Sequence, residues 1–299
     1  MNQGNATEQY LQQLRNMGFN EDMIEMYRKQ MTQYVDVANN WASQMKDQQE
    51  TMAAAFGNVF AAGAAAESPE PSIVLNPSSA LTNAEKWAIA CGADVAVANQ
   101  QYLNDVPTGL GKQMCRELLS DWWDIDSSEE LQETISWLKE EGHRLQYDTI
   151  CQALNTVSVK EAKEFLRSFA ARSEEEEETV IERLRNMRDA LELFREEGLI
   201  APGEQPDSLI WDYARIINLS RAGYDAGYME YHEALDTIMS CVPAIKASYT
   251  SWKQLSVAYQ FARCVWNGVD EEAFKAFRKG MDLLLTHPES PRVLLPWNL

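Results

Sequence analysis

The sequence has few of the residues that usually build a metal centre or an active site. Histidine occurs only three times, and no two histidines lie at a spacing that lets them share a metal ion. The chain also lacks a glycine-rich phosphate loop, a GxSxG elbow, an HExxH pair and an EF-hand loop. We therefore expect no metal ion and no cofactor, and no signature of this kind assigns a reaction.

Cysteine is also sparse, and its pattern excludes a disulfide framework. The five cysteines are odd in number, lie far apart and form no CxxC pair. We interpret them as buried, reduced thiols of a cytoplasmic protein. They are Cys91, Cys115, Cys151, Cys241 and Cys264.

Basic residues are outnumbered by acidic ones. The chain has 26 Lys and Arg against 46 Asp and Glu, which gives a formal net charge of -20. Nucleic-acid phosphates would repel such a protein, so we expect it not to bind nucleic acid. Two interpretations of the charge stay open: a solubility device, and a surface that suits a basic protein partner.

Long apolar runs are missing as well. The longest, residues 52–66, has 15 residues and is interrupted by Gly57, Asn58 and Gly63, whereas a membrane-spanning helix needs about 20. The start of the chain is polar and lacks the basic residues that precede the apolar core of a secretory signal. We expect no membrane contact and a cytoplasmic location.

Strand-like alternation of β-branched residues is almost absent, and helical periodicity dominates. Helix-start signals recur, each with a hydroxyl residue followed by a glutamate three positions later: Thr82 with Glu85, Ser127 with Glu130, and Ser158 with Glu161. We predict an all-α protein, in which a long amphipathic N-terminal helix precedes a compact multi-helix domain over residues 82–299.

The first part of the chain is predicted to be a separate helical arm, residues 1–66. Apolar positions from Ile24 to Ala55 follow the three- and four-residue spacing of a coiled-coil seam, although Gln48 and two tyrosines fit a seam poorly. The arm either packs on its own domain or forms a homo-oligomer through an intermolecular coil. Three prolines mark residues 67–81 as a linker.

The most informative stretch, residues 211–228, reads WDYARIINLSRAGYDAGY. At helical spacing its apolar residues share one arc, while Arg215, Asn218, Arg221 and Asp225 lie opposite, interleaved with tryptophan and alanine. A solvated face would carry mainly Lys, Glu and Gln. We therefore predict that this second face is covered too.

Buried arginines need partners, because an unpaired buried charge costs several kcal/mol. On the same helix, Asp212 lies three residues before Arg215, and Asp225 lies four residues after Arg221. Two interpretations stay open. One is a structural network of ion pairs that joins helices, and the other is a pocket for an anion or a polar ligand.

One histidine belongs to the same candidate site. His143 follows Gly142, which is expected to end one helix, and it precedes Arg144. His143 either bonds the backbone at this corner or acts as an acid–base group, since imidazole titrates near neutral pH. Arg144 could hold an anion. The candidate pocket therefore consists of His143, Arg144, Asp212, Arg215, Asn218, Arg221 and Asp225.

Three separated motifs resemble a known family. The central WDxxRxxNLxRxGYxAGY is preceded by WLKEEGHR at residues 137–144 and followed by SPRVLLPW at residues 290–297. Together they resemble the bacterial family called domain of unknown function 1266, over roughly residues 82–297. The resemblance informs fold and class and brings no established activity with it. Arg292 departs from the pattern, since we would expect an aromatic residue there.

Two functions are compatible with these observations. The first is a non-enzymatic, cytoplasmic protein-interaction domain, and one specific form is an immunity-like protein that masks a basic effector. The alternative is an enzyme or a small-anion-binding protein whose His, Arg, Asp and Asn residues form one pocket. Geometry separates them, because an enzyme needs these groups in one cleft open to solvent.

Overall fold

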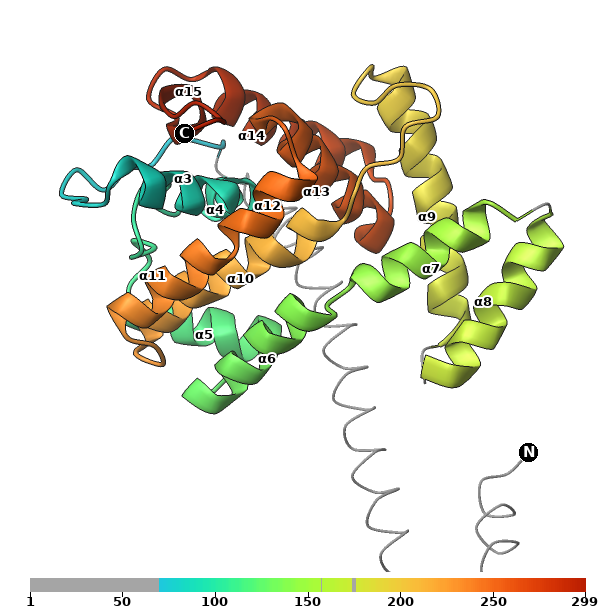
Figure 1. Cartoon of the computed structure of the whole chain (residues 1–299), viewed down its shortest axis with the longest axis horizontal. Coiled ribbons are helices and arrows are strands. Elements are labelled where there is room, and N and C mark those ends of the chain that lie inside the picture. Colours follow the sequence, from blue (N-terminus) through green and yellow to red (C-terminus); the bar gives the residue numbers. More distant parts are fainter. Residues whose placement is uncertain (1–69, 157, 174–175) are drawn as a thin grey trace, which may run out of the picture. The chain divides into compact units, whose positions relative to one another are not determined.

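The computed structural model describes residues 70–299, apart from residues 157 and 174–175. These residues all belong to one compact unit, Met52–Leu299. Every regular element in this part of the chain is a helix and none is a strand, which confirms the all-α class (Figure 1). The predicted arm of residues 1–66, with its coiled-coil seam, lies outside the described residues.

Two long connections, residues 99–111 and 197–208, lead into α5 and α10. The described helices, in chain order, are α3 (Asn83–Cys91), α4 (Ala93–Ala98), α5 (Lys112–Trp123), α6 (Ser128–Glu140), α7 (Arg144–Leu154), α8 (Val159–Ser173), α9 (Glu177–Glu196), α10 (Leu209–Ala226), α11 (Tyr231–Ser240), α12 (Val242–Ser248), α13 (Trp252–Asn267), α14 (Glu271–Thr286) and α15 (Pro291–Leu294).

The predicted helix starts are present. At α3 the Thr82 hydroxyl accepts the Glu85 N–H, and the Glu85 carboxylate accepts the Thr82 N–H, so the capping box is complete. At α6 the Ser127 hydroxyl accepts the Glu130 N–H, whereas the Glu130 carboxylate accepts the N–H of Asp126. The third predicted start, at α8, is capped by its serine in the same way. Local sequence therefore decides where these helices begin.

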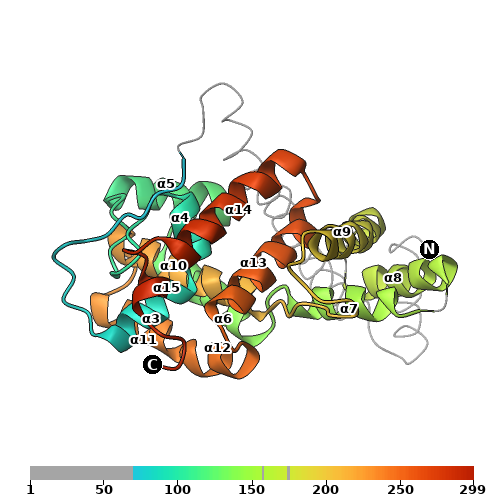
Figure 2. The ribbon, with the colours of Figure 1, turned by 90° about the horizontal axis from the view of Figure 1, so that it is seen from above.

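Helix α10 lies at the centre of the domain and packs against α5, α6, α11 and α13 (Figures 1 and 2). Every residue from Ile210 to Gly223 is buried, so Arg215, Asn218 and Arg221 of the polar arc are covered as predicted, whereas Asp225 is half-buried. At Gly223 an added Cβ would lie 2.3 Å from the Leu131 side chain, so glycine permits the close approach of α6. The helix ends at Gly227, whose φ of 81° is the left-handed conformation that glycine adopts easily.

Two hydrophobic cores share helix α13. Leu255 and Tyr259 belong to the larger core, which also contains residues of α3, α5, α6, α10 and α11. Phe261 and Val265 belong to a second core with residues of α7, α8 and α9. The short connection from α6 to α7 therefore joins two separately packed groups of helices.

The described part of the predicted linker is bound to the domain. The Leu103 N–H donates to the Val74 carbonyl at 2.9 Å. Asn76 donates its backbone N–H to Asn104 Oδ1 and its side-chain amide to Asp105 Oδ2, each at 2.7 Å. A truncation placed near residue 70 therefore preserves these contacts, whereas one placed at residue 80 removes them.

Candidate functional site

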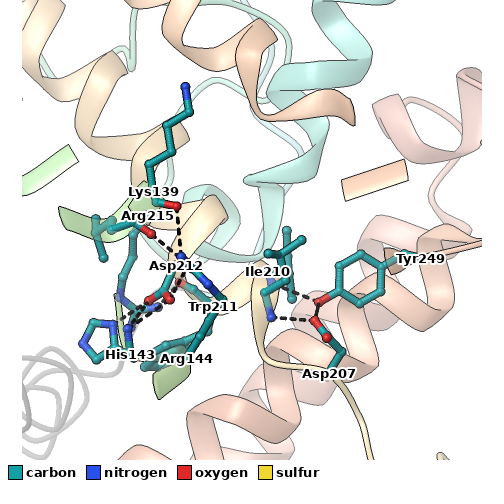
Figure 3. A network of polar contacts seen from close by, with 11 residues as sticks. Lys139, His143, Arg144, Asp207, Ile210, Trp211, Asp212, Arg215 and Tyr249 are labelled. Atoms are coloured by element: carbon teal, nitrogen blue, oxygen red, sulfur yellow. Dashed lines mark hydrogen bonds and ion pairs between the residues drawn. The ribbon is translucent and has the colours of Figure 1, made fainter. Parts of the chain in front are cut away.

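The first turn of α10 is fixed by a small hydrogen-bond network, shown in Figure 3. The Asp207 carboxylate accepts the Leu209 N–H at 2.6 Å and the Tyr249 hydroxyl at 2.9 Å. The Tyr249 oxygen in turn accepts the Ile210 N–H at 2.9 Å. These bonds satisfy N–H groups that a helix start leaves open, and they set the position of Asp212 in the next turn.

Asp212 holds the corner between α6 and α7 (Figure 3). Its carboxylate is fully buried and accepts the backbone N–H of His143, at 3.0 Å for Oδ2. It also accepts His143 Nδ1–H at 2.5 Å and Arg144 Nη1–H at 2.8 Å. The structure thus brings three predicted site residues together, and we name His143, Arg144 and Asp212 the corner cluster.

The corner cluster depends on Gly142. This residue has φ 57°, and a Cβ there would lie 2.3 Å from Asp212 Oδ2, so glycine leaves room for the carboxylate. Arg144 donates to the carbonyl oxygens of Leu138 at 2.8 Å and Lys139 at 3.0 Å, in the last turn of α6. One ion pair therefore caps the end of α6 and the start of α7 together.

His143 lies among aromatic rings. Its ring centroid is 5.1 Å from that of Trp137, 5.6 Å from Trp266 and 6.4 Å from Trp211. Burial lowers the pKa of His143, and the adjacent Asp212 opposes that shift without reversing it. The neutral ring therefore donates Nδ1–H to Asp212, and Nε2 makes no hydrogen bond with a described residue. His143 lies at the corner, but its ring bonds the Asp212 carboxylate instead of the backbone that was predicted, in an orientation that a general base would also need.

Arg215 is buried as predicted, but Asp212 does not pair with it among the described residues. Asp212 instead receives its donors from the corner cluster. Arg215 Nη1 donates to the Trp211 carbonyl at 2.6 Å, and the guanidinium lies 3.3 Å from the centroid of the Trp211 ring. Burial lowers the pKa of Arg215 to about 10. The expected Asp212–Arg215 pair was wrong because donors of His143 and Arg144, at the corner between α6 and α7, occupy the carboxylate.

Arg221 is surrounded by backbone carbonyl groups of one loop, residues 101–108. It is fully buried, and this burial lowers the pKa of Arg221 to about 10. The predicted Arg221–Asp225 pair is wrong, because the loop supplies the acceptors in place of a carboxylate. Nε donates to the carbonyl oxygens of Asp105 at 3.1 Å and Val106 at 3.2 Å, and Nη2 donates to those of Tyr102 and Pro107.

Asp225 and Asn218 anchor neighbouring segments. Asp225 accepts both the backbone N–H of Thr108 at 2.8 Å and its hydroxyl at 2.5 Å. Asn218 donates to the carbonyl oxygens of Gly92 at 3.1 Å and Ala214 at 2.7 Å, which ties α10 to the α3–α4 junction. The seven predicted residues therefore divide into the corner cluster, Arg215 alone, and a third group of Asn218, Arg221 and Asp225. These three groups share no common set of contacts.

The ion pair that sequence reasoning missed involves Arg292. Its Nη2 lies 2.7 Å from Asp94 Oδ2, and both side chains are buried. Arg292 also donates to the Ala90 carbonyl at 3.0 Å and lies over the Trp252 ring. The departure of Arg292 from the family pattern was the available signal, while Asp94, 198 residues away, offered none.

The cysteines and the acidic groups do not form a reactive or metal-binding centre in the described part of the chain. Four cysteines are buried and Cys151 is half-buried, and none is in a disulfide there. Burial raises the pKa of Cys115 and Cys264 to about 11, which makes both poor nucleophiles at neutral pH. Among the described residues no cluster of His, Cys, Asp or Glu could hold a metal ion.

No described helix combines the length and apolarity needed to cross a bilayer.

An acidic groove runs along the outer face of α6. Its volume is about 710 Å³, and its four glutamates make no ion pair with a described residue. Uncompensated carboxylates in a groove concentrate negative potential there. The sequence indicated a net acidic charge but not this location. The lining residues are Glu129, Gln132, Glu133, Ser136, Trp137, Glu140 and Glu141.

Fold and site together define an all-α domain that uses the buried Arg221 to fix a loop and the half-buried Arg144 to fix a helix corner, and that carries an acidic groove on its surface. The chain belongs to the family described as Protein of unknown function (DUF1266), whose model matches residues 118–297. The match contains all three motifs and confirms the resemblance seen in the sequence. No curated protein and no solved structure gives a match.

Proposed function

We propose that this domain is a non-enzymatic protein-interaction module that binds a basic segment of a partner protein in the acidic groove of α6. The observation that carries the proposal is the set of four glutamates in that groove, none of which is neutralised by a described ion pair. Complementary charge at such a surface speeds association, selects the partner and makes binding sensitive to salt.

The corner cluster supports this role by fixing the end of the groove. Arg144 binds the last carbonyl groups of α6, and Asp212 holds Arg144 from the buried central helix. Glu140 and Glu141 lie at that helix end. A binding surface built on a rigid helix loses less conformational entropy when a partner docks than one built on a loop.

The alternative, an enzyme or a small-anion site, has less support. It requires the seven predicted residues in one cleft, whereas Arg221 and Asp225 bond the loop of residues 101–108 and Asn218 bonds the α3–α4 junction. The Asp212–His143 pair has the orientation of a general base, but no hydroxyl or thiol nucleophile bonds its Nε2 among the described residues. A groove lined by glutamates would also repel an anionic substrate.

Several finer predictions from the sequence stay predictions. They are a bacterial source, a cytoplasmic location, an immunity-like role toward a basic effector, and a homo-oligomer formed through the N-terminal arm. The acidic groove supports the basic partner among these, because a cationic surface on an effector would complement it.

The test is a titration of the full-length protein with a fluorescent alternating glycine–arginine peptide, followed by anisotropy at low and at raised salt. Replacing Glu129, Glu133, Glu140 and Glu141 by glutamine should weaken binding by about tenfold or more, since each exposed charge pair contributes up to about 1 kcal/mol.

A matched control carries the same four changes on α9, at the exposed residues Glu178, Glu182, Glu192 and Glu196. It alters net charge equally and should keep most of the affinity. Equal loss in both variants would show that only net charge matters, and no binding by the wild type would reject the proposal.

A further inference from the structure

Trp137 occupies the middle of the acidic groove. It is half-buried and lines the groove together with glutamates at helical spacing. Glu133 lies four residues before it, Glu140 three residues after it and Glu141 four residues after it. Residues three or four apart lie on one helix face, so these carboxylates flank the indole ring on both sides along α6.

The ring of Trp137 is held from its inner side. Its centroid lies 5.1 Å from that of His143, with an interplanar angle of 66°. Asp212 fixes His143 through the side chain and the backbone. The indole therefore presents a preorganised aromatic surface to the groove, at little entropic cost when a ligand binds.

Four other tryptophans of this domain already carry a cation from the chain itself, whereas Trp137 does not carry one from any described residue. Its indole N–H likewise makes no hydrogen bond with a described residue. An aromatic face near carboxylates attracts a cation by its quadrupole and by their charge. The occupied rings are Trp87 with Lys246 at 4.7 Å, Trp211 with Arg215 at 3.3 Å, Trp252 with Arg292 at 5.3 Å and Trp266 with Arg183 at 5.5 Å.

We infer that Trp137 is the seat for an arginine side chain of the partner, with its guanidinium stacked on the indole and bonded by the flanking glutamates. This inference rests on the proposed function and names the residue that sets its specificity. Arginine is favoured over lysine, because a planar guanidinium can stack on the ring and donate to a carboxylate at the same time.

The experiment measures the affinity of the full-length protein for the glycine–arginine peptide and for a glycine–lysine peptide of equal length. Trp137→Leu should weaken arginine-peptide binding by about fivefold, the factor expected for one cation–π contact at a partly exposed site. Trp137→Phe keeps an aromatic ring with a weaker quadrupole, so its affinity for the arginine peptide should lie between those of the wild type and Trp137→Leu. Circular dichroism and the unfolding midpoint of each variant check that both are folded.

The outcomes separate this inference from the proposed function. Unchanged arginine-peptide affinity in both Trp137 variants overturns the inference. If neutralising the glutamates still lowers the peptide affinity, the proposed function stands without it. Equal affinity of the wild type for the two peptides overturns the choice of arginine. A fluorescence change on peptide binding that disappears in Trp137→Phe supports the stacked arrangement, and an identical change in that variant opposes it.

Discussion

Arg221 gives the sharpest stability prediction, because its guanidinium organises a whole loop. It is fully buried, and its donors reach four backbone carbonyl oxygens between residues 102 and 107. Arg221→Ala removes every one of these donors. The substitution also leaves a cavity beside α10. The four carbonyl oxygens then have no described residue that could donate to them in place of the guanidinium.

The expected cost follows from these contacts. Each buried acceptor that loses its partner costs about 1–3 kcal/mol, but water can enter the cavity and the loop can relax. We therefore expect Arg221→Ala to lower the free energy of unfolding by about 3–5 kcal/mol, the range for breaking a buried charged network. Arg221→Lys keeps the charge with fewer donors and should cost about half as much.

Urea denaturation followed by circular dichroism measures this change. Arg185→Ala is the control, since Arg185 is exposed on α9 and should change stability by no more than about 0.5 kcal/mol. If Arg221→Ala behaved like this control, the loop would not depend on the guanidinium, and the assignment of a structural role to Arg221 would be refuted.

Three further substitutions test the remaining buried groups. Gly142→Ala should destabilise by about 3 kcal/mol or more, from left-handed strain plus the clash with Asp212, whereas Gly198→Ala, with similar φ and open space, should cost only about 1–2 kcal/mol. Burial lowers the pKa of His143, so as the pH decreases this histidine is protonated in the unfolded chain before it is protonated in the folded one. The free energy of unfolding should therefore fall as the pH decreases below about 6.5. His143→Gln should reduce this pH dependence, measured by urea titrations at several pH values. Arg292→Ala should cost about 3–5 kcal/mol in the same denaturation assay because its buried carboxylate partner is left alone, and a cost near zero would contradict the pairing.

Local signals in the sequence predicted the helices well. The capping residues Thr82 and Ser127 are where the spacing placed them, because each depends on bonds within a few residues. The burial of both faces of α10 was also predictable, since alanine and tryptophan interrupt its polar arc.

The partners of the buried charges were not predictable in the same way. Arg221 bonds a loop about 116 residues earlier in the chain, and backbone carbonyl oxygens leave no trace in side-chain patterns. Asp212 was within helical reach of Arg215, yet donors 68 and 69 residues away occupy it. His143 and Asp212 do meet as predicted, but as a helix corner and not in one pocket with Arg221.

The acidic groove shows a further limit of the sequence. The net charge of -20 was compatible with a solubility device or with a basic partner, and it indicated no particular surface. Only the packing of α6 against α10 decides which of its glutamates face outward around Trp137. The proposed function therefore rests on a position that the fold creates.

A charge-reversal measurement tests the central claim most directly. Glu133, Glu140 and Glu141 are changed to lysine, and the affinities for a glycine–arginine and a glycine–glutamate peptide are measured beside those of the wild type. The account predicts that the variant loses the basic peptide and gains the acidic one, while the same three changes on α9, at Glu182, Glu192 and Glu196, leave the wild-type preference in place. A reversed groove that still prefers the basic peptide would contradict the assignment of this surface as the binding site.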